Sequence, residues 1–460
     1  MNTLIYTACL GLFGLLAEIF NLRKYLIPIL VLGLAVIFSL NLQTWNNPQT
    51  HFNGMLSDSN FSTAFSGLAL FIMLIILILS GDFYTSTDDE KHISDYMAIL
   101  MFTLCGALMM FSFSNMAMLF LGIETLSISL YVMAGSRRFE LKSNEAGFKY
   151  FLMGSFASAF LLFGIALVFG VTGTFSIDGI GNYMRMHADK LDPLFIVGML
   201  LMIFAMLFKV SAAPFHFWAP DVYEGAPSLI TALMSTLVKI AAFAAFYRLL
   251  SSCFVFALGK AEIILTISCA ATLLVGSLVA LVQDNFKRLL AYSGISHAGY
   301  MMLAIISIQG STDSALFLYS VGYAVASLAA FAIAITVFKS TGTESISGFN
   351  GLAKKNPLLA ASLTMAMLSL AGIPPFAGFF GKYFIFSEAF RNGWQNMVFV
   401  AIISSIIGVF YYMKVIVAMY SKPANEFEIK PTFAYQMVIA VCLIISIVLG
   451  LYPGVFTKLL

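Results

Sequence analysis

Titratable side chains lie inside apolar stretches that are long enough to cross a lipid bilayer, namely Glu124, Lys209, Lys239 and Lys382, with His297 near the middle of a fifth stretch. An ionisable group at the centre of a membrane helix costs about 2.5–3.5 kcal/mol on insertion scales, so several in one chain indicate function. Lysine, glutamate and histidine hold and release protons, whereas a cage for a hard metal ion needs clustered oxygen ligands. The pattern predicts an ion-moving membrane protein, with the proton as the favoured ion.

Each of these residues also has a structural interpretation. Lys209 and Lys382 lie near proline breaks, where a lysine can extend its ammonium group to the membrane surface. Glu124 could be neutral and hydrogen-bonded within its own helix, and His297 could be a packed core histidine. Lys239 lies near the middle of the run 228–250, too deep to reach the surface comfortably. It is therefore the strongest candidate, and a charge partnership between Glu124 and Lys209 is the hypothesis that keeps both groups ionised.

Composition places the chain in a membrane. The 460 residues are 60% apolar and only 10% charged, whereas soluble domains carry about 25% charged residues. The net charge of +2, without a basic aromatic patch, argues against nucleic-acid binding. The five cysteines are isolated and show no CxxC spacing, so neither a zinc nor an iron–sulfur site is indicated.

Hydropathy predicts an all-α polytopic protein of about fourteen transmembrane helices joined by short polar turns. The longest loops are 43–60 and 172–192. The predicted spans are 3–21, 25–42, 61–81, 95–112, 114–134, 148–171, 194–213, 228–250, 261–282, 289–309, 313–338, 357–384, 395–420 and 434–454.

The distribution of basic residues predicts the orientation of the chain. If the N-terminus lies outside, the loops that fall inside hold most of the lysines and arginines, among them Arg137, Lys142 and Lys355. Basic loops remain on the cytoplasmic side. We therefore expect both termini on the periplasmic side of a bacterial inner membrane.

Two of the predicted spans are broken in the same manner. The seventh ends in Lys209-Val-Ser-Ala-Ala-Pro214, and the twelfth contains Gly372-Ile-Pro-Pro-Phe-Ala-Gly378. Proline removes a backbone donor, and membranes tolerate the freed groups only where protein or water meets them. Because the breaks lie five helices apart, an odd number, the pattern predicts two inverted five-helix repeats, which is typical of a transport site. The expected divisions of the chain are the first three helices (1–94), the first five-helix repeat (95–250), the second, inverted repeat (261–420) and the C-terminal helix (421–460).

Five segments carry a resemblance to a known family. The chain resembles the antiporter-like membrane subunits of bacterial proton-pumping NADH:quinone oxidoreductase (respiratory complex I), and the N type most closely, because Lys239 stands where the L and M types usually have histidine. The matching segments are LGIETLSISLYVMAG (121–135), EAGFKYFLMG (145–154), FKVSAAPFHFWAPDVYEGAP (208–227), KRLLAYSGISHAGY (287–300) and LAGIPPFAGFFGK (370–382).

The resemblance implies proton-transfer roles for Glu124, Lys209, Lys239, His297 and Lys382. It also implies a subunit of a translocase with no cofactor of its own. FMN, iron–sulfur clusters and quinone are then expected in partner subunits, and the partners are other membrane-arm subunits, including another antiporter-like one. A multisubunit cation/proton antiporter or a membrane-bound hydrogenase is the nearest alternative. A quinone- or NADH-binding enzyme is disfavoured because no G-x-G-x-x-G fingerprint follows a strand, and a structural scaffold is disfavoured by the buried lysines.

Overall fold

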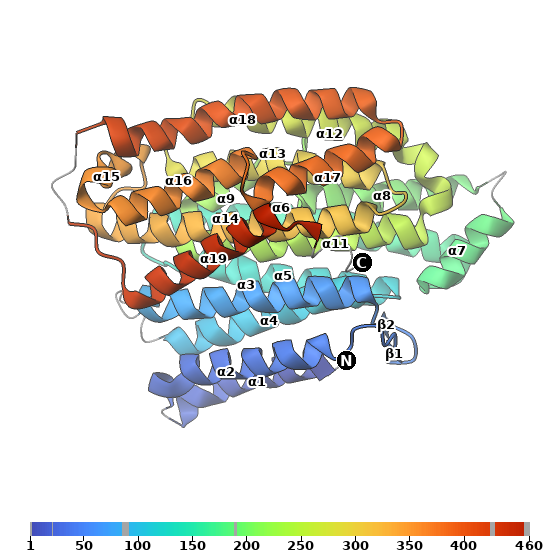
Figure 1. Ribbon diagram of the computed structural model, residues 1–460. Coiled ribbons are helices and arrows are strands. Elements are labelled where there is room, and N and C mark those ends of the chain that lie inside the picture. The colour runs from blue at the N-terminus through green and yellow to red at the C-terminus, as the bar shows by residue number, and fades with distance from the viewer. Residues whose placement is uncertain (1, 21, 85–91, 188–190, 424–427, 455–460) are drawn as a thin grey trace.

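The computed structural model describes residues 2–20, 22–84, 92–187, 191–423 and 428–454. The helices run side by side (Figure 1), with one small hairpin, β1 (Thr50–His51) and β2 (Leu56–Ser57). The first half contains α1 (Asn2–Ile19), α2 (Arg23–Leu42), α3 (Asn60–Tyr84), α4 (Ile93–Ser112), α5 (Met116–Ala134), α6 (Leu141–Thr172), α7 (Ile177–Met186), α8 (Pro193–Lys209), α9 (Trp218–Gly225), α10 (Ser228–Leu233), a π-helical turn η2 (Met234–Val238) and α11 (Lys239–Arg248).

The second half of the chain also consists of long helices, one of which is interrupted. It contains the turns η3 (Leu249–Cys253) and η4 (Val255–Ala257), then α12 (Leu258–Ala280), α13 (Phe286–Ile306), α14 (Thr312–Thr341), η5 (Ile346–Phe349), α15 (Leu352–Lys355), α16 (Pro357–Ala371), α17 (Ala377–Arg391), α18 (Gln395–Ser421) and α19 (Phe433–Leu451).

The helices agree with the predicted polytopic fold. Among the described residues, twelve helical segments are long and apolar enough to cross a membrane. Two shorter apolar helices, α8 and α16, are each continued after an interruption, by α9 and α17. If each interrupted pair is counted as one crossing, the described residues contain fourteen, the number expected, with the seventh and twelfth broken.

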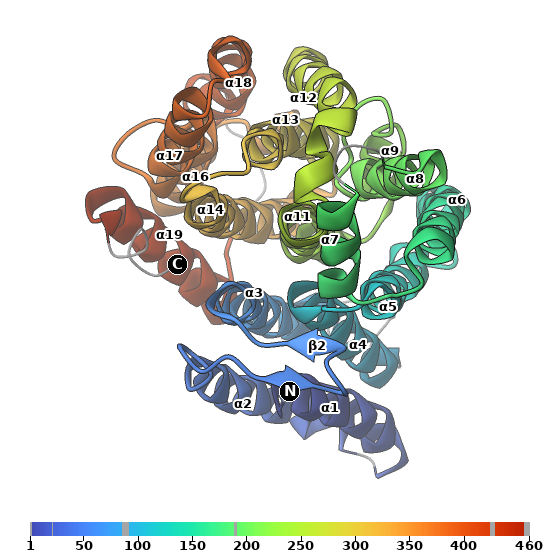
Figure 2. The ribbon, with the colours of Figure 1, turned by 90° about the vertical axis from the view of Figure 1, so that its right-hand side faces the viewer.

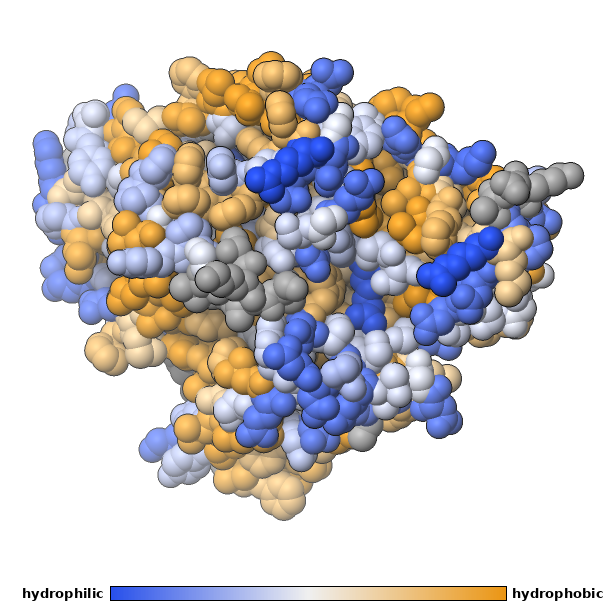
Figure 3. Space-filling model, turned by 45° about the vertical axis from the view of Figure 1, so that its right-hand side comes forward, coloured by the Kyte–Doolittle hydropathy of each residue, from blue (hydrophilic) through white to orange (hydrophobic). Residues whose placement is uncertain are grey.

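The most buried crossings lie at the centre of the bundle. Seen end-on in Figure 2, α11 and α14 are surrounded by the other helices, while α1 and α2 lie at the edge. Residues 228–247 are all buried, whereas only 28% of α1 is buried. Figure 3 shows broad apolar areas on the flank, with hydrophilic residues concentrated toward the end that comes forward. Polar residues on the central helices are therefore shielded from lipid by protein.

Close backbone approach fixes the packing around the first break. Helices α6 and α8 meet at Gly164 and Gly198, where a Cβ on Gly164 would lie 2.6 Å from the carbonyl oxygen of Gly198. Small residues let membrane helices approach in this way. At its N-terminus α8 is capped by Asp192, which accepts from the Leu194 N–H, with Pro193 in the first turn.

The two long loops contain more structure than predicted. The segment 172–192 was expected to be a loop, but it includes α7, and 43–60 includes the β1–β2 hairpin. Helix α7 buries only Ile177, Ile180 and Met184. Its ten residues are amphipathic and too short to produce a long apolar run, so hydropathy alone overlooks it.

The same helix-ending turn occurs twice, at opposite ends of the molecule, and each copy is called a corner. The sequence T-G-T-x-S-I-x-G occurs at 172–179 and again at 341–348. In each copy the glycine ends a long helix in the left-handed region, with φ of 70° at Gly173 and 69° at Gly342. Each corner then pairs with an asparagine that caps another helix, Ser176 with Asn115 and Ser345 with Asn285. The first corner leads into α7 and the second toward α15, which lie at opposite ends of the bundle (Figure 1).

Candidate functional site

Lys209 and Glu124 face the same region but do not touch. Lys209 ends α8, is 7% exposed, and donates to the hydroxyl of Ser127 on α5. The Glu124 carboxylate, one turn earlier on α5 and partly exposed, accepts instead from Ser158 on α6. The charges interact electrostatically, yet these two described side chains form no direct ion pair. The charge partnership therefore stays a prediction, and the Lys209 ammonium is held by Ser127, one helical turn from Glu124 on α5.

Lys239 lies where a π-helical turn ends. It follows η2, is 3% exposed, and its Nζ donates to the Gly294 carbonyl oxygen of α13 at 2.6 Å. A Cβ on Gly294 would lie 2.9 Å from that Nζ and 3.3 Å from the hydroxyl oxygen of Tyr323. The glycine therefore leaves room for both groups. π-helical turns frequently accompany functional sites because they shift the register of the side chains that follow.

His297 lies between two tyrosines. Its Nδ1 is 2.5 Å from the hydroxyl of Tyr319, and its Nε2 is 3.0 Å from that of Tyr412. The Tyr412 hydroxyl also bonds Ser293, the neighbour of Gly294 on α13. Both ring nitrogens are thus occupied by groups that can donate or accept, and the imidazole can pass a proton through either one.

Lys382 is built into the second break. It is 6% exposed, and its Nζ donates at 2.8 Å to the carbonyl oxygen of Ala371, the last residue of α16. A second bond of 2.9 Å joins it to the hydroxyl of Ser405 on α18. The ammonium also lies 4.7 Å from the centroid of the Tyr300 ring. The interruption frees a carbonyl, and the lysine satisfies it.

The sequence-predicted residues form a connected group and a separate one. Lys239, His297 and Lys382 are joined through α13, which supplies Gly294, His297 and Tyr300. Lys209 and Glu124 lie on the other side, around α5. Sequence reasoning named Ser127 only as a partner for Glu124 within its own helix. It missed the other hydroxyls that bond or neighbour the site residues, Ser158, Ser293, Ser405, Tyr319 and Tyr412. Their signal was weak because serine and tyrosine are common in membrane helices.

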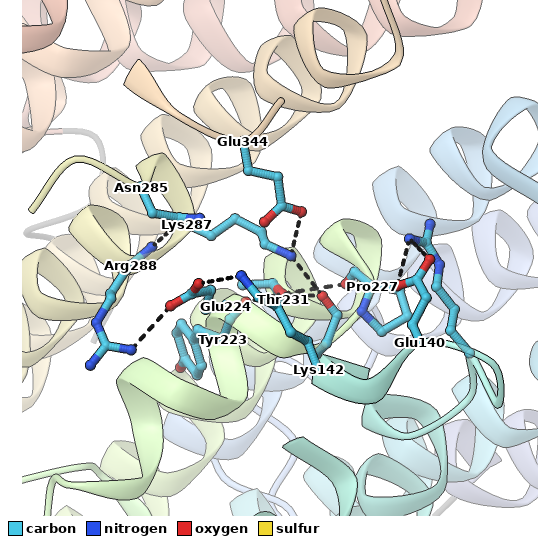
Figure 4. Close-up of polar contacts among 12 residues, drawn as sticks. Glu140, Lys142, Tyr223, Glu224, Pro227, Thr231, Asn285, Lys287, Arg288 and Glu344 are labelled. Atoms are coloured by element: carbon cyan, nitrogen blue, oxygen red, sulfur yellow. Dashed lines mark hydrogen bonds and ion pairs between the residues drawn. The ribbon is translucent and has the colours of Figure 1, made fainter. Parts of the chain in front are cut away.

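Charged residues at one end form a second polar region (Figure 4). Arg288 on α13 bonds Glu224 at 3.1 Å and Asp221 at 2.8 Å, both on α9. Lys142 on α6 bonds Glu224 at 2.9 Å. Lys287 bonds Glu344 at 2.7 Å. The second half of the broken seventh crossing is therefore fixed electrostatically to α6 and α13.

Across 2–20, 22–84, 92–187, 191–423 and 428–454, no three His, Cys, Asp or Glu side chains gather in a group that could hold a metal ion. The buried groups are ammonium, imidazole and hydroxyl groups, which suit the binding and transfer of protons.

Known proteins share both the sequence and this arrangement. Residues 113–408 match the family described as NADH:quinone oxidoreductase/Mrp antiporter, TM. The chain is 47% identical over 460 residues to NADH-quinone oxidoreductase subunit N of Flavobacterium psychrophilum, covering 100% of both. It is similar to a chain of respiratory complex I from Thermus thermophilus with bound aureothin, with a TM-score of 0.83 and 32% identity over 99% of this chain and 98% of that one. A chain of the Mrp complex from Dietzia sp. shares the fold, with a TM-score of 0.86 at 20% identity over 100% and 95%.

Proposed function

We propose, from the premise that the chain belongs to the NADH:quinone oxidoreductase/Mrp antiporter family, that it is the proton-translocating N subunit of a bacterial respiratory complex I. The observation that carries this proposal is the buried series of proton-binding groups from Lys239 through His297 to Lys382. Such groups are costly in a membrane interior and mark ion paths.

Proton movement along this series needs only small rearrangements. A protonated Lys239 gives up one N–H proton toward the hydroxyls beside Gly294. Tyr412 takes up a proton on its hydroxyl oxygen from the Ser293 side as it donates its own O–H proton to His297. His297 then supplies a proton toward Lys382 past Tyr300, with water completing the gaps. Each donor regains a proton from the group before it, so the charge moves while the side chains return to their starting state.

The driving event is proposed to arrive from partner subunits. FMN, iron–sulfur clusters and quinone would lie there, and NADH oxidation and quinone reduction would take place there. Electrostatic change at Glu124 would reach Lys209 through the attraction between their charges, while Ser127, one helical turn from Glu124 on α5, holds the Lys209 ammonium group. Lys209 lies at the end of α8, where the backbone is already interrupted, so a local change in charge can displace the break.

We place the subunit in the bacterial inner membrane with both termini periplasmic. The charged end shown in Figure 4 would then face the cytoplasm, the side from which protons are taken up. Other membrane-arm subunits, including another antiporter-like one, are the proposed partners.

A subunit of a cation/proton antiporter is the second candidate, favoured by the shared fold with the Mrp complex chain. Affinity purification of the tagged chain from its own membranes separates the two. The proposal expects co-purification of flavin- and iron–sulfur-bearing subunits with NADH:quinone activity. Isolation with cation/proton antiporter subunits, and without that activity, would contradict it.

A further inference from the structure

A polar pocket of about 550 Å³ opens at the charged end of the bundle. Its lining includes Lys142, Glu224, Asn285, Lys287 and Glu344, several of which are drawn in Figure 4. Lys287 is only 2% exposed. Its Nζ bonds the Glu344 carboxylate at 2.7 Å and the Ala226 carbonyl oxygen at 2.9 Å. The inner end of the pocket is therefore the enclosed ammonium group of Lys287, whereas its counter-charge, the Glu344 carboxylate, is accessible to water.

The repeated corner shows that this ion pair is not needed to build the local backbone. In the second copy the Phe286 N–H donates to the Glu344 carbonyl at 2.8 Å, and in the first the Met116 N–H donates to that of Phe175 at 2.9 Å. Lys287 follows Asn285 by two residues, as Ala117 follows Asn115. The opposite end of the molecule thus forms the same corner with alanine and phenylalanine in place of lysine and glutamate.

The pocket floor is connected to Lys239 by two elements. Lys287 and Gly294, which binds Lys239, lie seven residues apart on α13 and so share a face about 10 Å apart. Ala226 caps α9 and is followed by α10 and η2, which end at Lys239. Lys287 therefore lies two turns of α13 away from the residue that binds the central lysine.

Other charges around Lys287 are already balanced by exposed partners. Glu224 is held by Lys142 and Arg288. Arg137, which acts on Lys287 through its charge, pairs with Glu140. The Lys287–Glu344 pair differs because its cation is enclosed, so neutralising Glu344 removes the bonded counter-charge of a cation inside protein.

We propose that the Lys287–Glu344 pair takes up protons from the aqueous phase for delivery to Lys239, an inference that rests on the proposed function. Glu344 accepts a proton from hydronium in the pocket and forms an O–H bond. Lys287 then releases one N–H proton to water on the side of Lys239. The Glu344 proton restores the N–H bond, so one proton advances, both side chains regain their charge, and no electron is transferred.

The test uses the complete complex in proteoliposomes, with NADH-driven proton translocation measured by a pH-sensitive dye. Glu344→Gln and Lys287→Met should each lower the translocation rate about tenfold or more, since positioned acid–base groups contribute roughly 10²–10⁴-fold. Lys430→Met is the matched control, because it removes a lysine from an exposed ion pair, with Glu428, and should leave the rate unchanged. Wild-type translocation in an assembled Glu344→Gln complex would overturn the inference.

Chemical rescue separates uptake from a structural role. In Glu344→Ala, azide or formate can enter the pocket and should raise the translocation rate of the variant several-fold. This increase should saturate as the concentration of the acid rises. A structural pair would give no rescue by these acids, and that result would also overturn the inference. Lys239→Ala is the reference: if it is defective while Glu344→Gln is not, only the uptake site fails, and if Lys239→Ala translocates normally, the proposed function itself fails.

Discussion

The two broken crossings use a buried lysine in different ways. Lys209 precedes its break and binds a side chain, the Ser127 hydroxyl of α5. Lys382 follows its break and binds, besides the Ser405 hydroxyl, the backbone carbonyl of Ala371 that the interruption frees. The first lysine is thus positioned to sense a neighbouring charge, and the second to stabilise the interrupted helix itself. Similar sequence signals, a proline break with a nearby lysine, therefore produce an electrostatic contact in one place and a structural one in the other.

Removing Lys382 should have the largest effect. Lys382→Ala leaves the Ala371 carbonyl with only a 3.5 Å contact from Ser405, and an unsatisfied buried polar group costs about 1–3 kcal/mol. We expect both slower proton translocation and a lower midpoint of thermal unfolding for the purified complex. A variant as stable as wild type would show that the lysine does not support the break.

Removing Lys209 should affect translocation more selectively. In Lys209→Ala, the Ser127 hydroxyl keeps its bond to the Ile123 carbonyl, so no buried group loses its last partner. Translocation should fall several-fold while the unfolding midpoint stays close to wild type. Equal destabilisation by Lys209→Ala and Lys382→Ala would remove the distinction between the two breaks.

The attraction between the charges of Glu124 and Lys209 predicts non-additive effects around the first break. Glu124→Gln and Lys209→Ala should each reduce translocation, and the double variant should be little worse than the more severe single one, because both act on the same link. Ser127→Ala should reduce the coupling between them. Strictly additive logarithms of the rates in this cycle would mean that Glu124 and Lys209 act independently.

Orientation can be examined by labelling. Single cysteines at Lys142 and Lys355 should react with a membrane-impermeant maleimide only when the cytoplasmic side is accessible. Labelling of both positions from the periplasm would reverse the assignment of sides, and with it the side from which the pocket beside Lys287 takes up protons.

The sequence was sufficient for the crossings and for the buried charges. Apolar runs and proline breaks located fourteen crossings, because in lipid the backbone has few alternatives to a helix. It was insufficient for contacts between crossings. Whether Lys209 contacts Glu124 or Ser127 depends on how α5, α6 and α8 pack. The repeated sequence at 172–179 and 341–348 likewise does not reveal that each copy pairs with the asparagine that caps α5 or α13.

Lys239 is the residue on which the proposed proton path depends, and proton translocation by the Lys239→Ala complex tests that role. Alanine is favourable in a helix, and the substitution removes only one hydrogen bond, the one to the Gly294 carbonyl. The complex should therefore assemble and retain its partner subunits. The number of protons translocated per NADH oxidised should fall below that of wild type, measured in proteoliposomes of equal tightness. A fully assembled Lys239→Ala complex with the wild-type ratio would contradict the account.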